Sequence, residues 1–431
     1  MPQPAETPPP SHPPQRRRTL GDFLPPAFEA PRYRLFAAGQ AMSVLGTWIQ
    51  QVALAWLVFR ITGSTFLLGL TGFLLQIPHL FIAPVAGFLI DRLPRVTTLV
   101  IINTWLAILA TVLATVSFLH VQSIEVYLGI AILIGLGNAC EAPTRQSLVG
   151  AIVEDRRLLP SAISFNSVMF NTGRMIGPAI AGVLLARFSE SVCFLINAVS
   201  FIGIIGALIA MRLPESRTLA LPAGRRMMIR ASIKRLTALP VARYILPSAT
   251  AVALCAVPLN QMMPSVAVNL FGGSAGMVGA LLSASGIGAL AAALFLSLQK
   301  NHYAQFRVVQ VSPIIGGVAL MAFSQMTQLW LGLPLLAVVG AFVLSTSVST
   351  NTLLQQSVDD SWRGRVIGLY FMFFIGMAPF GNLMTGFMAG HIGLHSTLLI
   401  NGAFMACVGI IAQIRLSRAG ARQELRESVN L

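Results

Sequence analysis

Charged side chains are scarce in this chain of 431 residues, because only 10% are Asp, Glu, Lys or Arg while 55% are apolar. A soluble protein of this length needs a more polar surface, so the composition indicates a membrane protein. The four cysteines, Cys140, Cys193, Cys255 and Cys407, all fall inside apolar runs and lack the spacing of metal ligands. We therefore expect no metal site, and we interpret these thiols as small packing residues.

Signatures of catalysis are also missing from the sequence. It contains no Gly-rich phosphate-binding loop ending in Gly-Lys-Ser or Gly-Lys-Thr and no cluster of metal-ligand residues. No polar stretch is long enough to form an ATP-binding domain. We therefore expect no enzymatic activity and no cofactor.

Apolar runs of about 20 residues, the length of a membrane-spanning helix, recur along the chain. They are continuously apolar and do not alternate with a period of two, which predicts helices and not a barrel. The fold class is therefore an all-α membrane protein with twelve transmembrane helices. We expect these at residues 34–59, 66–90, 97–119, 125–148, 161–187, 191–211, 243–270, 276–298, 307–327, 330–356, 365–389 and 396–414.

The longest polar interruption divides the spans into two blocks of six, which predicts an internal repeat. An offset of 204 residues aligns Asp155 with Asp359, Gly177 with Gly381, Gly182 with Gly386, and Leu195-Ile196-Asn197 with Leu399-Ile400-Asn401. The predicted organisation is a disordered, Pro- and Arg-rich tail (1–31), a six-helix bundle (32–212), a basic linker (213–240), a second six-helix bundle (241–416) and a tail (417–431).

Lysine and arginine positions predict the orientation in the membrane. If the N-terminus is cytoplasmic, all 29 of these residues fall on the cytoplasmic side except Arg60, Arg174 and Arg187. Both termini are then cytoplasmic, and topology explains the net charge of +15 without a nucleic-acid partner.

Several motifs resemble those of a known family. Gly87, Asp91, Arg92 and Arg95 match G-x-x-x-D-R-x-x-R, the loop between the second and third helices of the major facilitator superfamily. A narrower similarity, to the branch with the bacterial enterobactin exporter and drug-efflux carriers, depends on Ser43-x-x-Gly46-x-Trp48, Leu57-Val58, Thr62-Gly63-Ser64, Pro143-x-Arg145-Gln146, Gly177-Pro178-x-x-x-Gly182 and Val358-Asp359-x-x-x-Arg363-Gly364-Arg365.

The resemblance implies a gate on the cytoplasmic side. Asp91 would bridge the two halves at the start of the eleventh helix, near Asp359, Arg363 and Arg365, and would stabilise the outward-facing state. Alternatively, these charges lie in a solvated loop and only fix the topology. Pro94 stands where the superfamily often has glycine, and the corresponding loop at residues 299–307 has no acid, so we expect an asymmetric gate.

Charges inside membrane spans cost several kcal/mol unless they face protein or water, so each is a candidate for function. Glu141 and Arg145 lie four residues apart, with Asn138 on the same face. Glu141 is either half of a neutralised structural pair or a proton-binding carboxylate. Arg174 either binds an anionic group of a substrate or makes a structural contact with backbone carbonyls or with Glu141.

Polar stripes indicate a path through the membrane. The candidates for substrate binding, besides Arg174 and Asn138, are Gln40, Ser43, Gln51, Asn171, Asn260, Gln261 and Ser349. Asn260 and Gln261 lie between Pro258 and Pro264, where a proline-broken helix can expose carbonyls to a cavity. Gly177, Pro178 and Gly182 resemble an antiporter motif and predict a helix that bends, although close packing is the alternative.

These observations favour a monomeric secondary carrier in which two bundles rock around a central site. We expect export of a small amphipathic molecule, siderophore-like or drug-like, in exchange for protons across a bilayer. The alternatives are uptake by a uniporter or symporter, and a lipid scramblase or non-transporting receptor. The lack of a cleavable targeting segment and of long luminal loops favours the bacterial cytoplasmic (inner) membrane.

Overall fold

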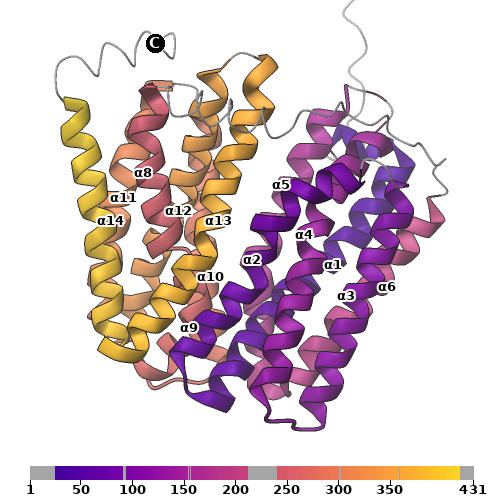
Figure 1. Cartoon of the computed structure of the whole chain (residues 1–431), viewed down its shortest axis with the longest axis horizontal. Coiled ribbons are helices and arrows are strands. Elements are labelled where there is room, and N and C mark those ends of the chain that lie inside the picture. The colour runs from indigo at the N-terminus through magenta and orange to yellow at the C-terminus, as the bar shows by residue number, and fades with distance from the viewer. Residues whose placement is uncertain are drawn as a thin grey trace, which may run out of the picture.

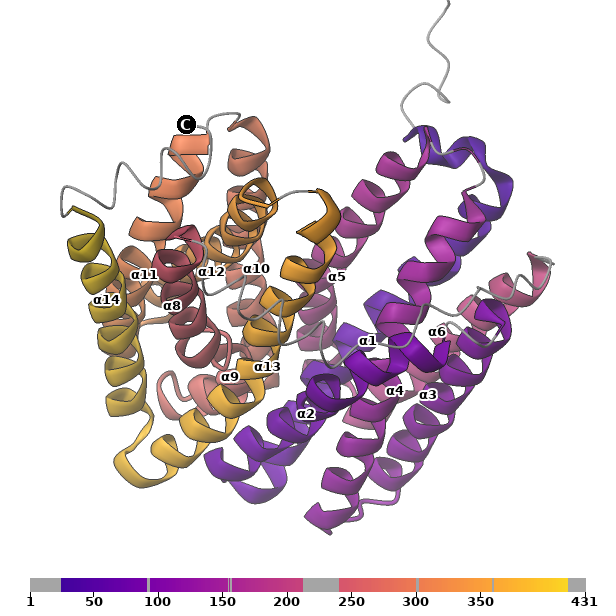
Figure 2. The same cartoon turned by 45° about the horizontal axis from the view of Figure 1, so that its top comes forward.

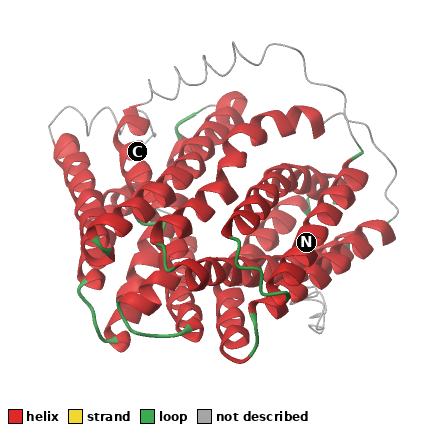
Figure 3. Ribbon diagram, turned by 60° about the horizontal axis from the view of Figure 1, so that its bottom comes forward, coloured by secondary structure: helices red, strands yellow, loops and turns green. Residues whose placement is uncertain are grey.

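The computed structural model describes residues 25–90, 94–153, 155, 157–211, 240–299, 302–358 and 360–417, and every regular element among them is helical (Figure 3). The N-terminal bundle contains α1 (Pro31–Thr62), α2 (Thr65–Ile90), α3 (Arg95–Phe118), α4 (Ile124–Ile152), α5 (Leu159–Arg187) and α6 (Glu190–Ala210). The C-terminal bundle contains α8 (Pro240–Cys255), α9 (Leu259–Asn269), α10 (Ala275–Leu298), α11 (His302–Ser324), α12 (Leu329–Gln356), α13 (Asp360–Ile392) and α14 (Leu394–Ser417).

The helices have the length and composition of membrane spans. Within the described residues, 11 segments are long and apolar enough to cross a membrane, and α8 and α9 together form one of them, Tyr244–Asn269. The 33-residue α13 corresponds to the remaining predicted span. The prediction of an all-α membrane protein with twelve spans in two bundles is confirmed.

A break interrupts the first span of the C-terminal bundle. Helix α8 ends at Cys255, and α9 begins at Leu259 with Pro258 as its N-terminal flanking residue. Proline has no amide proton and cannot continue the backbone hydrogen-bond ladder. The predicted proline-broken helix is therefore present, and Asn260 and Gln261 follow the break directly.

Among the described residues, the two bundles meet on one side of the molecule and diverge toward the other (Figures 1 and 2). We call the side where α1 begins and α14 ends the terminal side, and the opposite one the far side. Thr65 Oγ1 donates to the Gly386 carbonyl at 3.2 Å, and the rings of Phe73 and Phe380 lie 6.0 Å apart. These contacts join α2 to α13 in their far-side parts.

A second contact between the bundles joins α5 to α10. A Cβ atom added to Gly182 would lie 2.7 Å from Gly279 Cα, so the two backbones touch. This contact also lies in the far-side part of both helices. The described inter-bundle contacts therefore close the far side, while α2 and α13 separate toward the terminal side (Figure 2).

The halves repeat their contacts at the predicted offset. Gly182 packs on Gly279 of the other half, and Gly386, 204 positions later, packs on Gly69. Asn197 Nδ2 of α6 donates to Gln50 Oε1 of α1 at 2.8 Å, and its equivalent Asn401 of α14 donates to the Cys255 carbonyl of α8, the counterpart of α1, at 3.5 Å. Equivalent residues thus hold equivalent positions in the two bundles.

The predicted disordered tail includes residues that are folded. Pro26–Glu29 form a short 3-10 helix in which Ala27 is fully buried. The Phe28 ring packs edge-on against Phe165 of α5, with a centroid distance of 4.7 Å. Apolar contact therefore orders the end of this segment, whereas residues 1–24 lie outside the described part of the chain.

Candidate functional site

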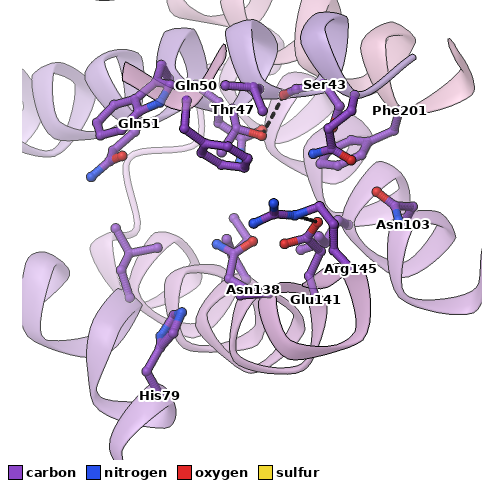
Figure 4. A pocket seen from close by; sticks show the side chains of 18 of the residues that line it. Ser43, Thr47, Gln50, Gln51, His79, Asn103, Asn138, Glu141, Arg145 and Phe201 are labelled. Carbon is purple, nitrogen blue, oxygen red and sulfur yellow. Dashed lines mark hydrogen bonds and ion pairs between the residues drawn. The ribbon is translucent and has the colours of Figure 1, made fainter. Parts of the chain in front are cut away.

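A cavity of about 330 Å³ lies among the helices of the N-terminal bundle, and we call it the main cavity. A volume of this size falls within the usual range for small-molecule pockets. Its wall combines apolar residues with amides and hydroxyls from α1, α2, α3 and α4 (Figure 4). The predicted residues Gln40, Ser43, Gln51, Asn138 and Glu141 all line this cavity.

An ion pair forms one part of the cavity wall. Arg145 Nε donates to Glu141 Oε1 at 2.8 Å, and the two side chains are only 7% and 16% exposed. Arg145 also lies over the Phe170 ring, with its Cζ 4.2 Å from the centroid, and its Nη1 reaches Asn166 Oδ1 at 3.4 Å. The helical spacing of four residues places both charges on one face of α4, where each neutralises the other.

Neutral polar groups surround the pair. Gln40 and Ser43 of α1 are about 5% and 4% exposed, and Thr47 Oγ1 donates to the Ser43 carbonyl at 2.8 Å. His79 of α2 lies across the cavity with its ring turned toward Asn138 (Figure 4), and its Nδ1 has no hydrogen-bond partner in the described structure. The wall therefore offers donors and acceptors that a polar part of a ligand can use.

A second, smaller cavity of about 40 Å³ lies between the bundles, and we call it the interface cavity. Arg174 and Pro178 of α5 line it from one half, and Asn260 and Gln261 of α9 line it from the other. Gln261 Nε2 donates to the Leu68 carbonyl of α2 at 3.2 Å, which fixes this amide across the two halves. Trp48 and Gln51 of α1 line both cavities, so these two residues separate them.

Arg174 and Glu141 do not form the ion pair that the sequence left open. Glu141 is paired with Arg145 in the main cavity, while Arg174 lines the interface cavity. Within the described part of the chain, no hydrogen bond or ion pair to a backbone carbonyl or a carboxylate involves Arg174.

Two predicted binding residues lie apart from the cavity walls described here. Asn171 Nδ2 donates to the Ser167 carbonyl of its own helix at 2.9 Å. Ser349 of α12 is 1% exposed, and its Oγ has no hydrogen-bond partner among the described atoms. A polar stripe on a helix therefore did not by itself determine which of its members face a cavity.

The predicted gate falls largely outside the described residues. Asp91, Arg92 and Asp359 are not described, and Gly87, Arg363 and Arg365 belong to helical stretches whose side chains are not described. Arg95 is the first residue of α3. The gate stays a prediction from the sequence.

The glycines of the antiporter-like motif lie at close helix contacts. A Cβ on Gly177 would lie 2.5 Å from Trp48 Cβ, and Gly182 touches the α10 backbone. Helix α5 continues through Pro178 from Leu159 to Arg187. This geometry accounts for the glycines by packing, and bending at Pro178 stays a prediction.

Sequence reasoning missed several lining residues. Gln50, Gln76 and Asn103 line the main cavity, and Ser285 lines the interface cavity. Gln76 and Asn103 each lie inside a long apolar run, and this isolation was a usable signal because buried amides require partners. Ser285 carries no such signal, since serine is common in membrane helices.

Curated relatives cover nearly the whole chain. It is 25% identical over 384 residues to the "Staphyloferrin A transporter" of Staphylococcus aureus, covering 88% of this chain and 94% of that protein. It is 26% identical over 389 residues to "Multidrug efflux pump Tap" of Mycolicibacterium fortuitum (88% and 93%). It is 22% identical over 384 residues to "Macrolide efflux protein A" of Streptococcus pyogenes, covering 87% of this chain and 93% of that protein. The similar proteins are thus transporters, and several are efflux proteins.

Solved structures share the fold at low sequence identity. The nucleoside transporter NupG aligns with a TM-score of 0.71 at 13% identity, covering 90% of this chain and 99% of that one. A bacterial homologue of the iron transporter ferroportin in an inward-facing state aligns with a TM-score of 0.70 at 14% identity (90% and 99%). The family model described as "Transmembrane secretion effector" matches residues 25–429. The chain therefore belongs to the transmembrane secretion effector family and is a membrane transporter of the major facilitator superfamily.

Proposed function

We propose that this chain exports a small amphipathic molecule across the bacterial cytoplasmic membrane in exchange for protons, as a monomer working by alternating access. The observation that carries the proposal is the placement of Glu141, the single acidic residue among those described as lining the main cavity. A carboxylate that faces a cavity in the middle of a membrane helix is expensive to keep and marks an ion pathway in many carriers.

Glu141 has the two states that coupling requires. When it is ionised, the charge-assisted hydrogen bond to Arg145 at 2.8 Å holds it in the wall. A proton would neutralise Glu141 and leave the Arg145 charge without its counter-ion, so that a ligand in the cavity would meet a different field. Binding of substrate and of a proton at one wall is then competitive, as exchange requires.

The arrangement of the bundles supports alternating access. They touch through α2 with α13 and through α5 with α10 on the far side, and they diverge toward the terminal side (Figure 1). If the termini are cytoplasmic, this arrangement is inward-facing. The Asp91 motif would close the terminal side in the outward-facing state. The efflux proteins among the relatives favour export over uptake.

The test is transport into inverted membrane vesicles, with a fluorescent drug and a catecholate siderophore as separate probes. We expect accumulation of at least one probe that collapses when the proton gradient is dissipated, and a loss of this accumulation in Glu141→Gln. The matched control is Glu125→Gln, because Glu125 is exposed at the other end of the same helix.

Each outcome separates the alternatives. Accumulation that survives Glu141→Gln would return this residue to a structural role. Saturable flux without gradient dependence would indicate a uniporter, and flux out of inverted vesicles would indicate uptake. The absence of saturable flux of either probe counts against the proposed function.

A further inference from the structure

One positive charge in the middle of the membrane has no counter-ion in the described structure. Arg174 lies near the centre of α5, 15 residues after Leu159 and 13 before Arg187. Its side chain is only partly exposed, and no described residue accepts a hydrogen bond from it. A guanidinium carries five N–H donors and stays charged, so it needs acceptors that the described protein does not supply.

The surroundings of Arg174 suit an anion. The described residues that line the interface cavity include no acid, and Gln51, Asn260, Gln261 and Ser285 contribute neutral polar groups. In the main cavity the charges of Glu141 and Arg145 cancel. With His79 neutral, the residues that line the two cavities together carry a net charge of one positive unit, which belongs to Arg174.

The two cavities differ in size, so they would hold different parts of a ligand. A cavity needs about 10–15 Å³ to hold one water molecule, so the interface cavity of about 40 Å³ accepts only a small group, such as a carboxylate. The main cavity of about 330 Å³ has room for a larger body. Trp48 and Gln51 line both cavities, so the cavities adjoin at these two side chains, and a ligand that displaces them would occupy both.

We propose that Arg174 binds an anionic group of the transported molecule, a carboxylate or a similar oxyanion, while the apolar body of that molecule occupies the main cavity. The substrate is then an amphipathic anion. A carboxylate pairs with a guanidinium through two parallel hydrogen bonds, which gives both affinity and orientation. This inference depends on the proposed transport function and specifies its substrate class.

The test compares two small fluorescent probes, dansylglycine, which has a free carboxylate, and dansylglycinamide, which is its neutral counterpart. Binding to the purified full-length chain in detergent is measured by saturable fluorescence enhancement. We expect the acid to bind about tenfold more tightly than the amide or better, since losing one charge-assisted pair costs at least this factor. Arg174→Gln removes the preference, and Arg174→Lys keeps part of it.

The control is Arg187→Gln, which removes one positive charge from the exposed end of the same helix. It should leave the preference unchanged. Equal affinity for acid and amide, a preference that survives Arg174→Gln, or no saturable binding of the acid would each overturn the inference.

Failure here is distinguishable from failure of the proposed function. Gradient-driven accumulation of a cationic drug that is unaffected by Arg174→Gln would contradict the inference that the substrate is an anion. It would still agree with the proposed export function. If the parent chain accumulates neither probe in inverted vesicles, the proposed function fails, whatever the dansyl probes do.

Discussion

At the scale of single residues, Glu141 and Arg145 form an ion pair in the wall of the main cavity. Both side chains are mostly buried, and they satisfy one another at 2.8 Å. Removing one partner of a buried pair strands the other charge, whereas removing both does not. Loss of one partner is therefore expected to cost more stability than loss of both.

We predict that Arg145→Met destabilises the protein by about 3 kcal/mol, because Glu141 then faces the cavity without its counter-ion. The double variant Glu141→Gln with Arg145→Met should recover part of this loss. Thermal unfolding of the purified proteins in detergent measures both effects. Arg187→Met, at an exposed position, is the control. Equal stability of the single and double variants would show that the stranded carboxylate costs little.

At the scale of elements, the far side is closed by helices that approach to backbone contact. Gly182 of α5 and Gly279 of α10 touch through their backbones, and Gly386 of α13 and Gly69 of α2 do the same. Any side chain at these positions must push two helices apart, because a backbone atom cannot rotate away. These crossings are therefore points where sequence controls the distance between the bundles.

We predict that Gly182→Val separates α5 from α10 and opens the far side. Overpacking costs about 1–3 kcal/mol, and 1.4 kcal/mol changes an equilibrium about tenfold. The measurement is maleimide labelling, from the far side, of Ser285→Cys in a background without the four native cysteines. Its rate should rise about tenfold in Gly182→Val.

Gly206→Val is the matched control for this substitution, because a Cβ on Gly206 meets no atom within 4 Å. It should leave the labelling rate unchanged. A rate that Gly182→Val also leaves unchanged would mean that the α5–α10 crossing does not restrain the far side.

At the scale of the whole molecule, the distribution of charge predicts how the chain sits in the membrane. In this topology, all lysines and arginines except Arg60, Arg174 and Arg187 belong to the terminal-side parts of helices or to the connections and tails on that side. Arg60 is paired with Glu190 at 2.7 Å on the far side. The positive-inside rule then assigns the terminal side to the cytoplasm.

We predict that green fluorescent protein fused to either end of the chain fluoresces, because it folds in the cytoplasm. Alkaline phosphatase, which needs an oxidising compartment, should be active after Gly393 and inactive after Ser357. These positions lie in far-side and terminal-side connections, respectively. The reverse pattern would invert the topology, and with it the direction of transport that we propose.

The sequence alone determined the class of fold, because a bilayer accepts only apolar segments of fixed length with satisfied backbones. The twelve spans follow from this rule, and the break at Pro258 follows from the missing amide proton of proline. Spacing within one helix also predicted the pairing of Glu141 with Arg145, since residues four apart share a face.

Only the tertiary structure decided which polar residues meet. Arg174 could have paired with Glu141, yet α1 inserts Trp48 and Gln51 between their cavities. Asn171 bonds to its own helix, and Ser285 reaches the interface cavity from the other half. Such placements depend on how helices distant in sequence are rotated and cross one another. Close contacts such as that of Gly182 with Gly279 set these crossings. Periodicity fixes the face of one helix but not the partner that the face meets.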